Sequence, residues 1–271
     1  MGPTQDINRL VAPFVPADAW VRFMMRPVLR LVGIVLGCYV VGVVVLYFRQ
    51  RAMLYFPSHA LRSSQLTPWV DGGHVIGYCR EVPNARAIWL MMHGNAGQAA
   101  DRDYALHCLS AQDSLYVLEY PGYGTRAGSP SLESMNRAAS EAYRLLRARN
   151  PRTPVCVLGE SVGSGPACAL AGETPAPDKI VLVVPFDTLE NVAAGHFPFL
   201  PVRLMLRDRW DNGAALKPYA GPVQIFGAID DGIIPIKHAK ALASHLPQAQ
   251  FTAIAGGHND WSDDGKVQIR R

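Results

Sequence analysis

The chain has 271 residues, of which 49% are hydrophobic and 18% are charged, and its mean hydropathy is +0.07. This composition excludes a disordered, collagen-like or disulfide-scaffold polypeptide and indicates a globular protein with an additional apolar segment. The first 49 residues carry five basic and two acidic side chains, so the remaining residues hold 21 basic and 20 acidic ones. A net charge of +1 over that larger part gives no indication of nucleic-acid binding.

The additional apolar segment is Leu31–Phe48, which has 18 residues without a charge and lies between Arg30 and Arg49. As a helix it would be about 27 Å long, close to the roughly 30 Å of a bilayer's hydrocarbon core. A core helix is rarely apolar on every face, and the apolar region of a signal peptide is shorter. The segment therefore predicts a single-pass transmembrane helix.

We divide the chain into an N-terminal interfacial segment (1–27), a transmembrane anchor (28–49) and a globular domain (50–271). Arginines lie on both sides of the anchor, and the cluster before it, Arg22, Arg26 and Arg30, is slightly the stronger. Because positive residues favour the cytoplasmic side, we expect the globular domain on the non-cytoplasmic side of the membrane.

The globular domain alternates between short apolar runs and a helical pattern. Buried strands are predicted at Ala87–Met92, Leu115–Glu119, Val155–Leu158, Ile180–Val184, Val223–Phe226 and Phe251–Ile254. Pro130 and Ser131 precede an amphipathic helix predicted at Leu132–Ala148. This alternation predicts an α/β fold with a mostly parallel sheet and helices on both faces. Ligands of such sheets bind beyond the carboxyl ends of the strands.

The cysteines of this domain show no pattern of metal binding. Cys79, Cys108, Cys156 and Cys168 form no C-x-x-C pair and no repeated spacing. We interpret them as buried thiols, and we expect neither a metal nor a cofactor.

A G-x-S-x-G pattern, Gly159 to Gly163, follows the run that ends at Leu158. At a strand-to-helix turn the two glycines allow a sharp bend that exposes the central serine. Such a serine is a nucleophile if a histidine removes its proton and a carboxylate orients that histidine. The pattern therefore predicts a nucleophile elbow at Ser161.

The two partners follow in the order that this chemistry requires. Asp230 and Asp231 come after the strand near Val223, and His258 comes after the last predicted strand. Neighbouring side chains of an extended chain point to opposite sides, so only one of the two aspartates can orient the histidine. We predict a catalytic triad of Ser161, His258 and one of these aspartates.

Acyl transfer also needs donors for a developing oxyanion. The backbone N–H of Val162 follows the nucleophile, and a second N–H is expected in the loop HGNAG at 93–97, after an earlier strand. In that loop Asn95 is the predicted donor. We interpret His93 as a residue that holds the loop by hydrogen bonding.

Together the motifs HGNAG (93–97), EYPGYG (119–124), GESVGSGPA (159–167), DDGIIP (230–235) and GGHND (256–260) resemble the α/β-hydrolase superfamily. The resemblance is to a subgroup of membrane-anchored serine hydrolases with HGNAG and YPGYG signatures, often described as serine-aminopeptidase-like. It implies Ser161 as nucleophile, His258 as general base and the N–H groups of Asn95 and Val162 as the oxyanion hole.

The family pattern usually has one aspartate in the loop after the strand near Val223, whereas this sequence has two. Counting back from Pro235 by the family's D-x-x-x-P spacing assigns the orienting role to Asp231, whereas counting forward from Gly227 assigns it to Asp230. We adopt Asp231.

The segment 186–221 is long for a loop and rich in apolar residues, which predicts a small helical cap or, alternatively, packing against the sheet edge. Its apolar and aromatic members include His196, Phe197, Phe199, Leu200, Met205 and Trp210.

The resulting hypothesis is a membrane-anchored serine esterase or thioesterase acting on a small-molecule or lipid-like acyl substrate. A serine peptidase with the same triad, and a catalytically idle binding protein on the same fold, are the alternatives. The segment from Trp261 onward is a poor match to a helix. The sequence gives no indication of the oligomeric state.

Overall fold

The structure, a computed structural model, describes residues 17–60 and 63–271, which divide into two compact units after Phe48. The first unit is most of helix α1 (Ala17–Leu54), whose 38 residues continue through Pro27 without a break. Within it, Trp20–Leu54 is long and apolar enough to be a candidate membrane span, and none of its most apolar part is buried. The expected interfacial segment lies partly outside the described residues, and its boundary at residue 27 stays a prediction.

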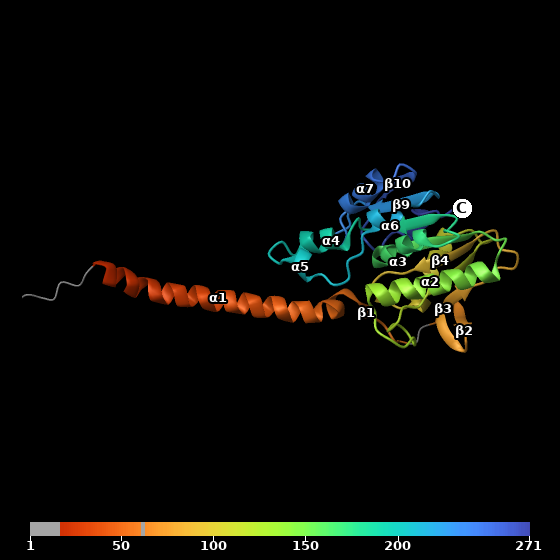
Figure 1. The fold of residues 1–271 in the computed structure, drawn as a ribbon. Helices are drawn as coiled ribbons and strands as arrows, with labels where there is room; N and C mark the ends of the chain where they lie inside the picture. The colour runs from red at the N-terminus through yellow and green to blue at the C-terminus, as the bar shows by residue number, and fades with distance from the viewer. Residues whose placement is uncertain (1–16, 61–62) are drawn as a thin grey trace, which may run out of the picture. The chain divides into compact units, whose positions relative to one another are not determined.

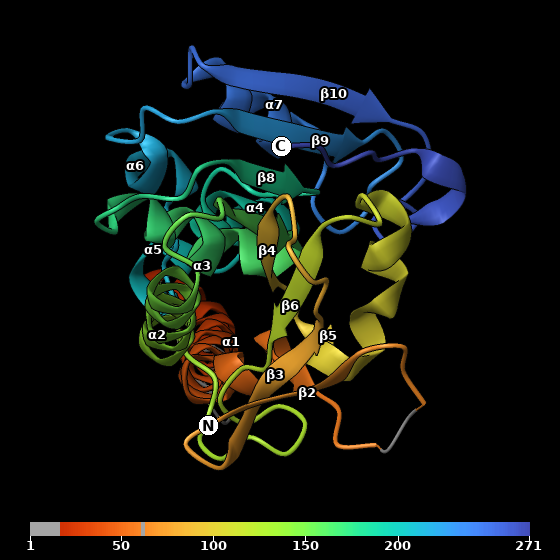
Figure 2. The ribbon, with the colours of Figure 1, turned by 90° about the vertical axis from the view of Figure 1, so that its right-hand side faces the viewer.

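An eight-stranded sheet forms the centre of the second unit (Figure 2). Its strands are β2 (Thr67–Asp71), β3 (His74–Arg80), β4 (Ile88–Met92), β6 (Ser114–Leu118), β7 (Val155–Glu160), β8 (Ile180–Val183), β9 (Val223–Ala228) and β10 (Ala249–Ile254). In space they follow the order β10-β9-β8-β7-β4-β6-β3-β2, with parallel pairing from β10 to β6. All six strands expected from the sequence are confirmed.

The antiparallel hairpin β2–β3 was not among the expected strands. Its turn contains Gly72 and Gly73, both with positive φ, at +56° and +80°. An Asp-Gly-Gly turn between alternating residues is a recognisable hairpin signal. A second, two-stranded sheet pairs β1 (Phe56–Pro57) with β5 (Ala96–Gly97) in parallel.

α-Helices cover one face of the sheet, and a 3-10 helix together with the C-terminal segment covers the other (Figures 1 and 2). The α-helices of the second unit are α2 (Leu132–Arg149), α3 (Ser164–Ala169), α4 (Leu189–His196), α5 (Val202–Met205), α6 (Asn212–Leu216) and α7 (Lys237–Ser244). The core on one face includes residues of α2, α3, α6 and α7. The opposite core contains the 3-10 helix η1 (Ala99–Cys108) and the extended C-terminal segment.

Alternation along the buried strands separates these two cores. On β4, Leu90 belongs to the helical face, whereas Trp89 and Met91 belong to the face beneath η1. All three side chains are fully buried. The four cysteines of the domain are buried and free, as expected.

The segment 186–221 carries α4, α5 and α6, and its expected role as a cap stays a prediction. Its aromatic residues divide into two groups. Trp210 is buried against α3, where a Cβ on Gly165 would lie 2.6 Å from the Trp210 ring, whereas Phe199 is exposed. Trp210 therefore belongs to the domain core, whereas the chain around α5 exposes large apolar side chains.

Candidate active site

The turn after β7 has the backbone expected of a nucleophile elbow. Ser161 has φ +54°, a value that side chains disfavour, and it opens the short 3-10 helix η2 (Ser161–Gly163) that continues into α3. A Cβ on Gly163 would lie 2.2 Å from the carbonyl oxygen of Met92, and one on Gly159 would lie 2.7 Å from the Cβ of Ala167. The two glycines are therefore required for the close packing that holds Ser161 at the end of β7.

The structure brings Ser161, His258 and Asp231 together at the carboxyl ends of β7, β10 and β9. The Oγ of Ser161 lies 2.8 Å from Nε2 of His258, and Nδ1 of His258 lies 2.7 Å from Oδ2 of Asp231. An ionised carboxylate only accepts hydrogen bonds, so Nδ1–H donates to Asp231 and Nε2 is left to accept from the serine hydroxyl. This is the geometry of a general base acting on a nucleophile.

Of the two adjacent aspartates, Asp231 is the one that contacts the imidazole. Its other oxygen, Oδ1, accepts hydrogen bonds from the backbone N–H groups of Ile233 (2.8 Å) and Ile234 (2.7 Å). Asp231 is buried, whereas the side chain of Asp230 is exposed and its N–H donates to the carbonyl oxygen of Gly256. Asp230 lies in the turn after β9 and is exposed, so Asp231 is the aspartate that meets the imidazole.

The loop after β4 lies beside the elbow, because Met92 and Gly159 are partners in adjacent strands. Three hydrogen bonds hold Asn95 in this loop. Its side-chain amide donates to the carbonyl oxygen of Leu54 (2.9 Å), and its own carbonyl oxygen accepts from Phe56 N–H (2.9 Å) and from the hydroxyl of Tyr123 (2.6 Å). The last residue of α1 and the segment that follows it are therefore part of the support of the loop, which the sequence did not indicate.

His93 holds the same loop and is not exposed at the site. Its Nδ1 lies 2.7 Å from the carbonyl oxygen of Gly94, and the hydroxyl of Tyr120 donates to the carbonyl oxygen of His93 (2.8 Å). Complete burial lowers the pKa of His93, so its imidazole is neutral at pH 7. Tyr120 and Tyr123 of the EYPGYG motif thus both bond to the HGNAG loop.

Glu160, the residue before the nucleophile, connects three segments of the site. Its carboxylate accepts hydrogen bonds from Gly94 N–H (3.0 Å), from the Tyr104 hydroxyl (2.8 Å) and from Trp261 Nε1 (2.9 Å). Burial by itself would raise the pKa of Glu160. The positive charge of Arg102 and the three donors outweigh burial and hold this pKa below its ordinary value. Glu160 is therefore a buried carboxylate at neutral pH, and the motif pattern gave no sign of it because its position in G-x-S-x-G accepts any residue.

The chain after His258 packs as an extended segment. Its regular structure is the three-residue 3-10 helix η4 (Asp263–Gly265), in agreement with the poor helical pattern. Trp261, Val267 and Ile269 are buried, and Ile269 N–H donates to the carbonyl oxygen of Cys108. The histidine loop is therefore held by packing against η1 and by the bond between Trp261 and Glu160.

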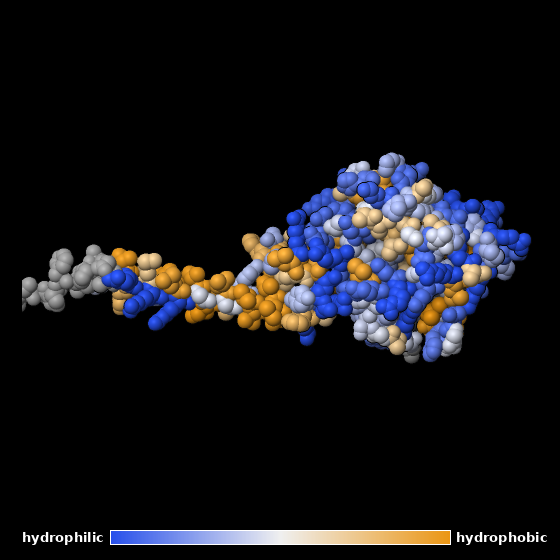
Figure 3. All heavy atoms as spheres, in the orientation of Figure 1, coloured by the Kyte–Doolittle hydropathy of each residue, from blue (hydrophilic) through white to orange (hydrophobic). Residues whose placement is uncertain are grey.

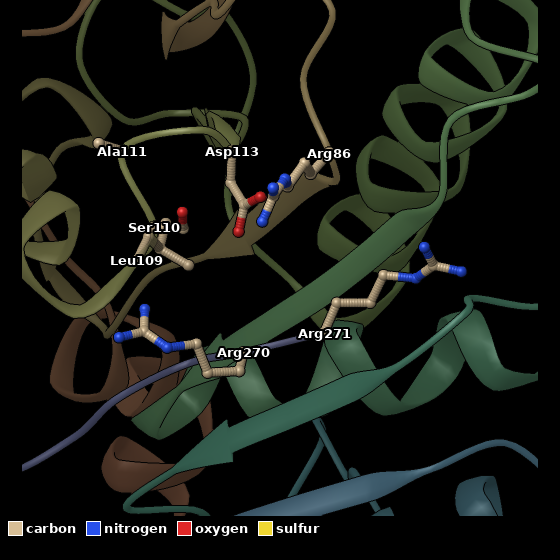
Figure 4. Close-up of a pocket in the computed structure, with 7 residues that line it drawn as sticks. All are labelled: Arg86, Leu109, Ser110, Ala111, Asp113, Arg270 and Arg271. Carbon is tan, nitrogen blue, oxygen red and sulfur yellow. The ribbon is translucent and has the colours of Figure 1, made fainter.

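A cavity of about 630 Å³ lies elsewhere, next to the amino ends of β4 and β6 (Figure 4). Arg86 and Asp113, which precede these strands, line it together with Arg270 and Arg271 from the C-terminal segment. Ser161 and its partners follow the carboxyl ends of the strands. The cavity is thus at the opposite edge of the sheet from the candidate active site.

Solved structures with the same arrangement of strands and helices identify the fold. An esterase of Pyrococcus furiosus aligns with a TM-score of 0.59 and 12% identity over 78% of this chain and 92% of its own. A lipase-esterase related protein of Clostridium acetobutylicum aligns with a TM-score of 0.55 and 13% identity, over 67% of this chain and 91% of its own. This protein has the α/β-hydrolase fold.

Two proteins similar in sequence to this α/β-hydrolase-fold chain align with different shares of it. An uncharacterized protein of Mycobacterium tuberculosis is 28% identical over 264 residues, which is 90% of this chain and 92% of that protein. The lysophosphatidylserine lipase ABHD12 of Xenopus tropicalis is 30% identical over 197 residues, which is 64% of this chain. The alignment spans about half, 51%, of that lipase. No model of a protein family matches the sequence.

The buried carboxylate of Glu160 gives a stability prediction. Glu160→Gln keeps the shape of the side chain but replaces one acceptor oxygen with a donor group, so at least one of the three buried donors loses its partner. We expect the free energy of unfolding at pH 7, measured by urea titration of the full chain in detergent micelles, to fall by about 1–3 kcal/mol.

The same substitution should also change the pH dependence of stability. A folded pKa below the unfolded value of about 4.3 stabilises the protein above that pH, and the contribution is lost as the pH falls further. The difference between wild type and variant should therefore shrink in acid. The matched control Glu141→Gln alters an exposed glutamate on α2 and should stay within about 0.5 kcal/mol of wild type. Equal losses in both variants would contradict the assigned role of Glu160.

Proposed function

We propose that this protein is a membrane-anchored serine hydrolase that cleaves an acyl ester or thioester through Ser161, His258 and Asp231. The observation that carries the proposal is the continuous pair of short contacts, 2.8 Å from Ser161 Oγ to His258 Nε2 and 2.7 Å from His258 Nδ1 to Asp231. The esterase with the same fold supports acyl-ester chemistry, and the similar lysophosphatidylserine lipase supports a lipid-like substrate.

In the first half of the reaction, Oγ of Ser161 attacks the acyl carbonyl carbon while Nε2 of His258 accepts the hydroxyl proton. Asp231 stabilises the resulting imidazolium and keeps the ring in the required tautomer. The carbon–oxygen or carbon–sulfur bond to the leaving group then breaks, and the imidazolium returns its proton to that group. The product of this half is an acyl-enzyme on Ser161.

The oxyanion formed during attack requires two donors close to Ser161. The backbone N–H of Val162 is the first of these, as in other nucleophile elbows. For the second we propose the backbone N–H of Asn95. The side-chain amide and the carbonyl group of Asn95 are already engaged with Leu54, Phe56 and Tyr123, which supports a fixed orientation of the remaining N–H.

In the second half, water takes the place of the leaving group. His258 removes a proton from the water as its oxygen attacks the acyl carbon, and the proton then passes to Ser161 Oγ as the acyl–oxygen bond breaks. The carboxylic acid leaves, and the starting state is restored. These steps use only side chains and backbone groups of the chain itself.

The proposed nucleophile is tested by covalent labelling. A fluorophosphonate probe should form a phosphorus–oxygen bond to Ser161 with loss of fluoride, and Ser161→Ala should neither label nor turn over an activated ester. We expect the loss of activity to be on the order of a thousandfold or more. Ser129→Ala, at an exposed serine, should label like wild type. Undiminished labelling of Ser161→Ala would remove the assignment, and an unlabelled wild type would favour an idle binding protein.

The orienting carboxylate is tested by two substitutions at adjacent positions. Asp231→Asn removes the acceptor that selects the productive tautomer of His258, so kcat for an activated ester should fall by about 10³–10⁴-fold. Asp230→Asn changes an exposed side chain and should leave kcat within about twofold of wild type. If the two variants rank in the reverse order, the orienting carboxylate is Asp230.

We also propose that the domain from residue 50 onward lies on the non-cytoplasmic side of its membrane. The basic cluster of Arg22, Arg26 and Arg30 before the apolar segment supports this orientation. In a bacterial host, protease added to intact spheroplasts should then digest the domain. Digestion that occurs only after the spheroplasts are lysed would reverse the orientation.

A further inference from the structure

Large apolar side chains are exposed together on the segment that joins α4 to α5 and on α5 itself. Phe199 and Leu204 are 87% and 86% exposed, and Phe197 is 49% exposed. We call these three residues the apolar tip. Apolar surface is visible over this part of the molecule in Figure 3. Single exposed apolar residues are ordinary, but a cluster from one short segment marks a contact surface.

The end of α5 is bonded to the first residues of the second unit, which lie in the last part of α1 just after the charge-free apolar segment. The side chain of Gln50 donates to the carbonyl oxygen of Met205 (3.0 Å) and accepts from the N–H of Arg207 (2.8 Å). Next to it, Arg51 forms a two-pronged ion pair with the buried carboxylate of Asp208, at 2.7 and 3.0 Å. The apolar segment ends at Phe48, so these bonds tie the end of α5 to residues only two and three positions after that segment in the chain.

The charge of the tip segment suits a lipid surface. From Phe197 to Arg207 the sequence is FPFLPVRLMLR, which contains no acidic residue. The side chain of Arg203 is 80% exposed, although its Nε lies 3.3 Å from a carboxylate oxygen of Glu190. Aromatic and aliphatic side chains flanked by arginine are typical of segments that lie in the interface of a bilayer with anionic lipids.

The residue just before the apolar tip contacts the loop that carries Asp231. Nε2 of His196, at the end of α4, lies 2.7 Å from the carbonyl oxygen of Ile233, and the N–H of Ile233 donates to Asp231. The side chains of Ile229 and Ile233, on either side of the two aspartates, are 57% and 54% exposed. Exposed apolar residues therefore occur both in the apolar tip and beside the proposed triad.

We propose that the apolar tip inserts into the surface of the membrane that holds α1, and that it keeps the neighbouring candidate active site close to the bilayer. An acyl lipid could then reach Ser161 from the membrane without crossing water. The docking itself depends only on the anchor and the tip. Its consequence for the substrate rests on the proposed hydrolase function.

Insertion is tested by fluorescence on the full chain in vesicles of phosphatidylcholine with a minor fraction of phosphatidylserine. Leu204→Cys carries an environment-sensitive dye in a Cys38→Ser background, since the other cysteines are buried. We expect its emission to shift to the blue and to be quenched by lipids with nitroxide groups near the head of the acyl chain. The control Ala111→Cys, exposed beside the cavity of Figure 4, should show neither effect.

Two outcomes would overturn the docking. Quenching at position 204 no greater than at position 111 would mean that the tip stays in water. A blue shift that persists in detergent, depends on protein concentration and lacks quenching by the lipids would mean that a second copy of the chain covers the tip.

A second measurement tests the consequence for the substrate. The double variant Phe199→Ser and Leu204→Ser should lose on the order of tenfold in hydrolysis of a lysophospholipid in vesicles, while a short soluble ester is hydrolysed within about twofold of wild type. Val70→Ser, at an exposed apolar residue of β2, should change neither rate. Equal losses on both substrates would contradict membrane delivery. A wild type inactive on both would refute the hydrolase function, and the fluorescence result would still decide the docking.

Discussion

The buried carboxylate of Glu160 is the interaction on which the arrangement of the site depends. A charge without contact to water is stable only when donors and an opposite charge surround it, and here Gly94, Tyr104, Trp261 and Arg102 supply them. Those donors come from the loop after β4, from η1 and from the loop after the histidine. Satisfying one carboxylate therefore brings together the segments that surround Ser161.

The end of α1 and the residues that follow it add a second constraint on the loop after β4. Leu54 and Phe56 bond to Asn95, and β1 pairs with β5 directly beyond it. The segment that connects the apolar helix to the domain is thus also a structural part of the site. Ser161, Asp231 and His258 follow β7, β9 and β10, so this connection bears on Asn95 directly and on those three residues only through the loop.

Gln50 and Arg51 extend this connection to α5 through their bonds with Met205, Arg207 and Asp208. The helical insertion is consequently held to the first residues of the second unit as well as to the domain core. The start of the second unit, the helical insertion and the proposed active site are thus connected by hydrogen bonds and ion pairs within the second unit.

The sequence by itself determined the elements whose signal is local. Continuous apolar runs predicted β4 and the five strands β6 to β10. Strands covered on both faces have no polar side, which holds for these strands except the partly exposed edge strand β10. The glycines around Ser161 predicted the sharp turn after β7. The order of serine, aspartate and histidine at strand ends predicted which residues meet.

Only the tertiary structure decided the contacts made between distant segments. The counts from Pro235 and from Gly227 favoured different aspartates. In the folded chain it is Asp231, and not Asp230, that contacts His258. The role of Glu160 depends on donors from 56 to 101 residues away in the chain, and the support of Asn95 depends on residues about 40 positions earlier. Such pairings leave no periodic or local pattern, because hydrogen-bond partners are selected by the packing of the folded chain.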